Sequence, residues 1–142
     1  MMLPKREVNI LRFNIQVGNP RLETTRDYKD IDAFGAIESI FVMNTENVII
    51  NWNYICIPLS YKYDISYMLK DILELLERLE FEDCGKMEIY WLPDTFRTDW
   101  YINWKDGNMK IHSRWECTVG RLEKILNEQS DISISIDEFI KE

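Results

Sequence analysis

The sequence contains few of the residues on which most catalytic and metal sites depend. Among 142 residues there are one histidine, three cysteines and five glycines. The cysteines, Cys56, Cys84 and Cys117, are scattered without a CxxC pair, and an odd number is a poor basis for a disulfide framework. Zinc sites usually need three or four closely spaced His or Cys ligands. We therefore expect no metal and no cofactor, and we interpret the cysteines as small buried residues.

Nucleotide-binding loops and long apolar runs are missing as well. Neither GxxxxGKS/T nor GxGxxG occurs, which argues against a nucleotide enzyme. The longest apolar stretches are far shorter than the ~20 residues that cross a bilayer, and the opening MMLPKREVN lacks the apolar segment of a signal peptide. A chain of this length with 46% hydrophobic residues fits one domain. We expect a single cytoplasmic domain, residues 1–142, with no membrane contact.

Charge of one sign predominates. The chain carries 25 acidic and 17 basic residues, a formal net charge of −8. Such a surface repels phosphate backbones, and the sequence has no basic cluster of the kind that nucleic-acid binders show, so we expect no direct nucleic-acid binding. An acidic surface speeds the encounter with a basic protein. Solubility alone is an equally simple reason for it.

The most informative stretch is TDWYINWKDGNMKIHSRWEC, Thr98 to Cys117. Asp106-Gly107 between two alternating runs predicts a hairpin with a two-residue turn. Counting outward from the turn pairs Trp104 with Met109, Ile102 with Ile111, Trp100 with Ser113, and Asp99 with Arg114. Because side chains alternate across a strand, one face is apolar: Trp100, Ile102, Trp104, Met109, Ile111 and Trp115. The opposite face is polar: Asp99, Tyr101, Asn103, Lys110, His112, Arg114 and Glu116. We interpret the tryptophans as packing residues rather than as a catalytic or binding site.

Three further segments predict helices. DISYMLKDILELLERLEF places apolar residues at three-and-four spacing and is the one long helix, with Asp64 as its N-cap. VGRLEKILNEQ predicts a short helix, weakened by Gly120. In SISIDEFIKE, Ser135 and Glu138 form a capping box, while Ile134 and Phe139 are spaced for a hydrophobic staple. A terminal helix should therefore begin at Ile136.

The remaining periodic segments predict strands. They are Arg6 to Val17, AIESIFVMN, VIINWNYICIPL and MEIYWLP. We expect AIESIFVMN and VIINWNYICIPL to pair as a hairpin through the polar TEN, with Trp52, Tyr54 and Cys56 on one side. Strands do not alternate with helices as they would in a parallel fold. The pattern predicts an α+β fold, a mainly antiparallel sheet of about six strands with one long central helix and one or two short C-terminal helices.

Catalysis would have to use the single histidine, His112. Cys117 lies five residues away on the same expected strand and points to the opposite face, so this pair is excluded by geometry. Cys56 or Cys84 could approach His112 through tertiary contacts. A small enzyme using His112 with a cysteine or a carboxylate therefore stays open as an alternative. The acidic DYKDIDAFG has Asp27, Asp30 and Asp32 at spacings that do not match a calcium loop.

The overall plan of the chain resembles the immunity proteins of bacterial polymorphic toxin systems, such as contact-dependent growth inhibition. The resemblance extends from the first strand through DISYMLKDILELLERLE to the terminal SIDEFIKE. It implies a protein without catalytic activity that binds and neutralises a cognate toxin domain, commonly a basic nuclease, by stoichiometric contact. A small acidic adaptor, or an anti-defence protein that imitates nucleic acid, is the other binding role that the composition allows.

Two surfaces are candidates for the toxin contact. One is the polar segment with Asp27, Asp30 and Asp32, and the other is the outward hairpin face. The hairpin residues are Asp99, Tyr101, His112 and Glu116. We favour both over the helix stripe of Asp71, Glu74 and Glu77, because a long irregular segment and a tyrosine-bearing strand offer shaped contacts, whereas that stripe offers charge alone.

Overall fold

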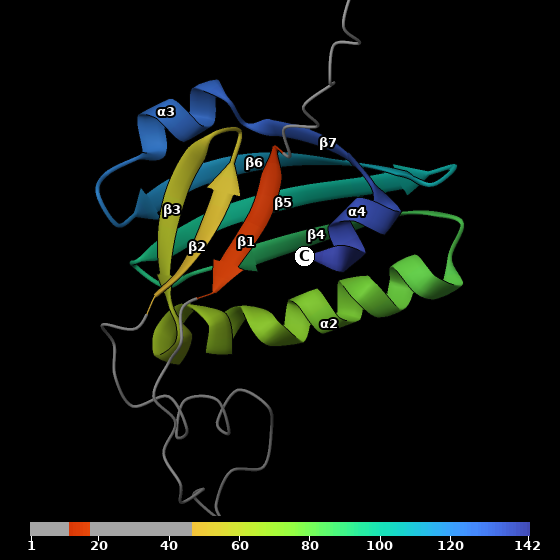
Figure 1. Ribbon diagram of the computed structural model, residues 1–142, viewed down its shortest axis with the longest axis horizontal. Helices are drawn as coiled ribbons and strands as arrows, with labels where there is room; N and C mark the ends of the chain where they lie inside the picture. The colour runs from red at the N-terminus through yellow and green to blue at the C-terminus, as the bar shows by residue number, and fades with distance from the viewer. Residues whose placement is uncertain (1–11, 18–46) are drawn as a thin grey trace, which may run out of the picture.

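The computed structural model describes residues 12–17 and 47–142, which form two antiparallel sheets and three α-helices (Figure 1). The first sheet has the order β1-β2-β3, with β1 (Phe13–Val17), β2 (Asn47–Trp52) and β3 (Ile55–Ser60). The second has the order β4-β5-β6-β7, with β4 (Cys84–Trp91), β5 (Phe96–Lys105), β6 (Asn108–Thr118) and β7 (Asp131–Ser135). The helices are α2 (Ser66–Phe81), α3 (Glu123–Glu128) and α4 (Ile136–Lys141). The expected α+β class with antiparallel strands is confirmed, but the strands divide between two sheets.

The two sheets pack face to face through aromatic rings. Trp52 on β2 lies 5.1 Å from Trp100 and 5.3 Å from Trp115, measured between ring centroids. Phe13 on β1 contacts Trp100 at 6.3 Å and stacks on Phe139 of α4 at 5.5 Å. In Figure 1 the three-stranded sheet and α4 lie in front of the four-stranded sheet. Rings of this size bury a large apolar area and account for much of the core.

The long helix α2 covers the same side of the four-stranded sheet as β1–β3 do. The indole N–H of Trp91 donates to Asp71 Oδ2 on α2 at 2.9 Å. The indole N–H of Trp104 donates to the carbonyl of Glu82, which directly follows α2, at 3.0 Å. The guanidinium of Arg78 lies over the Trp104 ring, 5.0 Å from its centroid. Among the described residues, none of the helices combines the length and apolarity needed to cross a bilayer.

The expected Trp-rich hairpin is confirmed residue by residue. Its register pairs Trp104 with Met109 and Ile102 with Ile111. Asp106 and Gly107 have φ angles of 52° and 77°, as a type I′ turn requires. All six residues of the apolar face are buried. Gly85 on β4 lies opposite Trp104, and a Cβ there would lie 2.4 Å from the indole ring, so only glycine fits.

The expectation for VIINWNYICIPL is wrong, because this segment is itself a hairpin. The chain turns at Asn53 and Tyr54, whose φ angles are 46° and 70°. Asn53 stabilises the turn by donating to the carbonyls of Gln129 and Asp131. The turn separates Trp52, which is fully buried, from Tyr54 and Cys56, which are exposed. The first half of the strand expected from Arg6 to Val17, residues 6–11, lies outside the described residues, and β1 forms within the second half. The whole of AIESIFVMN and its pairing also lie outside the described residues.

The start of the long helix also differs from the expectation. A π-helical turn, η1 (Tyr61–Ile65), precedes α2, and Ser60 caps it by accepting from the backbone N–H groups of Tyr63 and Asp64. Asp64 is therefore not the N-cap. The buried carboxylate of Asp64 accepts a hydrogen bond from the Ser60 N–H at 2.8 Å, so the two residues are bonded in both directions. This carboxylate also accepts from the Thr95 hydroxyl. This reciprocal pairing satisfies groups that a helix start leaves unpaired.

The C-terminal helix begins where the capping box predicts. Ser135 Oγ accepts from the Glu138 N–H at 3.1 Å, and α4 starts at Ile136. Ile134 and Phe139 are both buried, as the staple requires. The sequence reading missed β7, which pairs with β6 and directs Ile132 and Ile134 into the core.

The interpretation of the cysteines as buried residues is wrong. Cys56 and Cys84 are exposed and Cys117 is partly buried. Cys56 alternates with the buried Ile57 and points away from the core for that reason. Cys84 begins β4 on its outward face, opposite Lys105.

The first prediction concerns the hairpin core. We expect Trp104→Ala to lower the free energy of unfolding by about 3–5 kcal/mol, because it removes a buried ring and leaves a cavity. Phe81→Ala is the control, since this ring is 76% exposed and its loss should cost only about 0.5 kcal/mol. Denaturant unfolding measures both, and equal effects would contradict the described register.

Candidate functional site

The outward side of the four-stranded sheet, here called the outer sheet face, carries a regular array of exposed and half-buried side chains. Side chains alternate along β4 and β6 between buried and exposed positions, so one side of each strand contacts the core and the other contacts solvent. Strand pairing arranges the outward side chains in rows across the sheet. One such row is Glu88, Tyr101, His112 and Asp131.

Aromatic rings form the centre of the outer sheet face. The Tyr101 ring lies 6.1 Å from the His112 ring and 6.3 Å from the Tyr90 ring, so three rings from β4, β5 and β6 are neighbours. Tyr90 is 50% exposed. His112 Nδ1 is hydrogen-bonded to Asp131 Oδ1, which orients the imidazole. Rigid rings exposed on strands are typical of protein-binding surfaces.

Three carboxylates of this face, Glu88, Glu116 and Asp131, have side-chain partners within the molecule. Asp99 lies opposite Arg114 in the strand register, and Arg114 forms its ion pair with Glu116 at 3.1 Å. Glu88 accepts from the Tyr90 hydroxyl. The four candidates Asp99, Tyr101, His112 and Glu116 thus lie together on one surface, as expected. Asp27, Asp30 and Asp32 lie outside the described residues.

The outer sheet face is not acidic as a whole, although the chain is. Its basic residues number five: Lys86, Arg97, Lys105, Lys110 and Arg114. Its acidic residues number four: Glu88, Asp99, Glu116 and Asp131. A contact led by acidic residues here stays a prediction, and any partner of this face also meets basic groups.

The solvent side of α2 is a second surface with exposed acidic residues. Glu74, Glu77 and Glu80 are exposed there, and Leu73 and Phe81 are exposed to 52% and 76%. This helix surface therefore offers apolar contacts as well as charge, which our reading of the sequence missed. The signal was present, because Leu73 lies outside the apolar stripe of three-and-four spacing.

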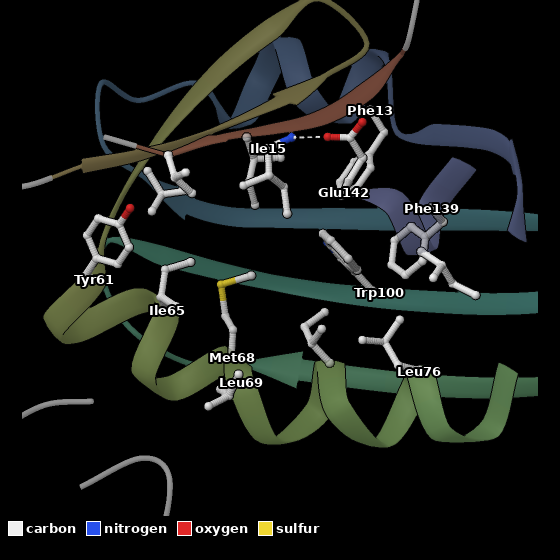
Figure 2. A pocket seen from close by; sticks show the side chains of 15 residues that line it. Phe13, Ile15, Tyr61, Ile65, Met68, Leu69, Leu76, Trp100, Phe139 and Glu142 are labelled. Atoms are coloured by element: carbon white, nitrogen blue, oxygen red, sulfur yellow. Dashed lines mark hydrogen bonds between the residues drawn. The ribbon is translucent and has the colours of Figure 1, made fainter. Parts of the chain in front are cut away.

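An apolar pocket of about 280 Å³ lies between the two sheets, α2 and α4 (Figure 2). Figure 2 shows Met68 on α2 pointing towards the side of β1 that carries Ile15, with Trp100 and Phe139 at one side. Glu142 lines its edge, and its carboxylate accepts from the Ile15 N–H at 3.2 Å. Apart from Glu142 and Tyr61, the lining has no ionisable side chain. The pocket can accommodate an apolar group, but its lining supplies no acid–base pair.

The described residues contain no group of three or more His, Cys, Asp or Glu side chains placed to hold a metal ion. Within residues 12–17 and 47–142, the His112–Asp131 pair resembles part of a catalytic dyad. Both side chains are largely exposed, at 59% and 77%, and no serine or cysteine within the described ranges is hydrogen-bonded to the imidazole. A general base needs a nucleophile within hydrogen-bond reach. The geometry is that of a hydrogen-bonded pair on the surface.

The second prediction concerns Tyr90, whose hydroxyl donates to Glu88. This hydrogen bond, followed by burial and the negative charge of Glu88, raises the pKa of Tyr90 to about 12 from 10.0. We expect Glu88→Gln to lower that pKa towards its ordinary value, because a neutral amide is a weaker acceptor. Since the pKa is raised in the folded state, the bond stabilises the fold fully below pH 10 and ceases to do so as the pH rises through about 12.

Phenolate absorbance against pH measures this shift, as the difference between each protein and the same protein with Tyr90→Phe. Glu116→Gln is the control, because Glu116 contacts Arg114 rather than a tyrosine. A Tyr90 titration that Glu88→Gln leaves unmoved would refute the assignment.

Comparison of the chain with protein-family models, with curated proteins and with solved structures gives no match. A functional proposal for this chain therefore rests on its own residues and their arrangement.

Proposed function

We propose that this protein binds and neutralises a cognate toxin domain by stoichiometric protein–protein contact, as the immunity proteins of polymorphic toxin systems do. The observation that carries the proposal is the uncovered outer sheet face with Tyr90, Tyr101 and His112 side by side. Tyrosine supplies a large contact area at a low entropic cost and frequently dominates the binding energy of interfaces. The paired strands beneath it hold these rings in place.

The size of the outer sheet face suits a protein partner. Its strands contain 8, 10, 11 and 5 residues. With about 3.3 Å per residue and 4.8 Å between strands, the face covers roughly 500 Å² in projection. Standard interfaces bury about 800 Å² of accessible surface on each partner. Projecting side chains and the adjoining loops bring the face into that range.

Charge favours a basic partner, such as a nuclease domain. The net charge of −8 attracts a basic protein from beyond contact distance and raises the association rate. At contact, Asp99 and Glu116 are already close to Arg114. We therefore assign these carboxylates mainly to steering and to the rim, and the tyrosines to the centre of the interface.

The third prediction tests the binding surface with a toxin domain encoded by a gene next to that of this protein, the candidate partner under the proposal. We expect Tyr101→Ala to weaken binding by roughly 10- to 100-fold, as for a central interface aromatic. Tyr54→Ala is the matched control, because Tyr54 is 60% exposed on the β2–β3 turn and should have little effect. Calorimetry gives both affinities and the expected 1:1 ratio. Equal affinities of the two variants would move the interface away from the outer sheet face.

The charge contribution is measured in the same system by the association rate across a salt series. Asp99→Lys should slow association at low salt, and the difference should decrease as salt screens it. Glu77→Lys makes the same charge change on α2 and separates a local effect from a change in net charge. Association that is indifferent to salt and to both reversals would exclude a contact steered by acidic residues.

The fourth prediction separates binding from catalysis. We expect His112→Ala to weaken toxin binding and protection by no more than a few-fold, less than Tyr101→Ala does, because the imidazole offers a smaller contact area than the tyrosines and the exposed His112–Asp131 pair has no assigned role in proton transfer. A loss of protection by several orders of magnitude, with unchanged folding and binding, would support an enzyme that uses His112. Circular dichroism and calorimetry provide the two controls.

A further inference from the structure

Three lysines lie close together at the end of the outer sheet face nearest the β5–β6 turn. Lys86 on β4, Lys105 on β5 and Lys110 on β6 are all exposed. The register pairs Lys86 with Asn103 and Asn103 with Lys110, so the neutral Asn103 lies between two lysines. Lys105 lies two residues along β5 from Asn103 and points to the same side. These residues are here called the lysine cluster.

The spacing allows the three ammonium groups to reach one ligand. Neighbouring strands are about 4.8 Å apart and alternate residues about 6.6 Å apart, which places the three Cα atoms within about 10 Å of one another. Each lysine side chain is long and flexible and carries three hydrogen-bond donors. The Asn103 amide adds two more donors in the middle.

Stability does not explain this arrangement. No ion pair joins any of the three lysines to an acidic side chain of the described residues, whereas Arg78, Arg97 and Arg114 each have one. A chain with a net charge of −8 also needs no added positive charge for solubility. The cluster is therefore a local exception to the charge of the molecule.

We propose that the lysine cluster binds a carboxylate-bearing segment of a partner protein. This inference rests on the proposed function and specifies it further, because it requires the partner to place acidic side chains at this end and basic or aromatic ones at the other. A phosphate backbone fits less well, since the next row contains Glu88 and Asp131 and the whole chain repels a long polyanion. Two or three carboxylates fit the cluster without reaching that row.

The test uses the full chain and a hexaglutamate peptide, followed by NMR at low salt. We expect the amide signals of the cluster strands to shift as the peptide is added. The triple variant Lys86→Gln, Lys105→Gln, Lys110→Gln should weaken binding about three- to tenfold or more, the sum expected from three exposed ion pairs. The control triple Lys70→Gln, Lys124→Gln, Lys141→Gln changes the net charge equally at exposed positions elsewhere. Equal losses in both triples would overturn the inference.

A single-stranded oligonucleotide and inorganic phosphate identify the anion. Binding of either one that is tighter than that of hexaglutamate, and that depends on the same three lysines, would overturn the assignment to a carboxylate ligand. Weak or absent binding of both, next to measurable peptide binding, supports it.

The toxin domain of the neighbouring gene distinguishes this inference from the proposed function. If the toxin binds and the cluster triple weakens it more than the control triple does, both proposals are supported. If the toxin binds and neither triple variant changes its affinity, the lysine-cluster inference is refuted while the proposed function stands. Peptide binding that needs the cluster, together with no toxin binding, refutes the proposed function alone.

Discussion

Trp100 and Trp52 lie 5.1 Å apart between the two sheets, and this contact is the constraint on which the rest of the structure depends. Trp91 on the neighbouring strand joins the same cluster at 4.7 Å from Trp100. Because side chains alternate along a strand, burying Trp100 and Trp104 forces Asp99, Tyr101 and Asn103 to the opposite side. The aromatic core therefore produces the outer sheet face as well as the stability of the fold, and a shift of one residue in register would destroy both.

Sequence patterns predicted those parts of the fold in which local chemistry and burial agree. The Asp106-Gly107 turn and the Ser135 capping box each specify backbone geometry through residues adjacent in sequence, and both are confirmed. The turn at Asn53 and Tyr54 was missed because it is stabilised from a distance, by the carbonyls of Gln129 and Asp131. The helix start was misplaced for a similar reason, since the π-helical turn shifts the cap from Asp64 to Ser60.

The candidate site was predictable only in part. The alternation along β5 and β6 placed Asp99, Tyr101, His112 and Glu116 on one side, and this grouping holds. Tyr90 and Lys86 come from β4, and no pattern in the sequence states which residues of β4 face which residues of β5. The lysine cluster could not be predicted for the same reason. Its three members come from three strands, so the sequence contains no run of basic residues that would reveal it. Net charge determines how a partner is attracted from a distance, whereas the register determines which charges it meets.

Because side chains alternate between the two sides of a strand, the residues that can contact a partner differ from the residues that form the core. Substitutions at the outward positions of β4, β5 and β6 change the charge and shape of the outer sheet face without touching the indole rings behind it. The strands themselves are ordered by their pairing before a partner arrives, so little conformational entropy is lost on binding. A helix surface such as that of α2 lacks this separation, because Asp71 on its flank also accepts the hydrogen bond of the buried Trp91. A sheet with one buried and one open side can thus change its partner by surface substitution while its core stays constant, which is the property that the proposed toxin-binding role would require.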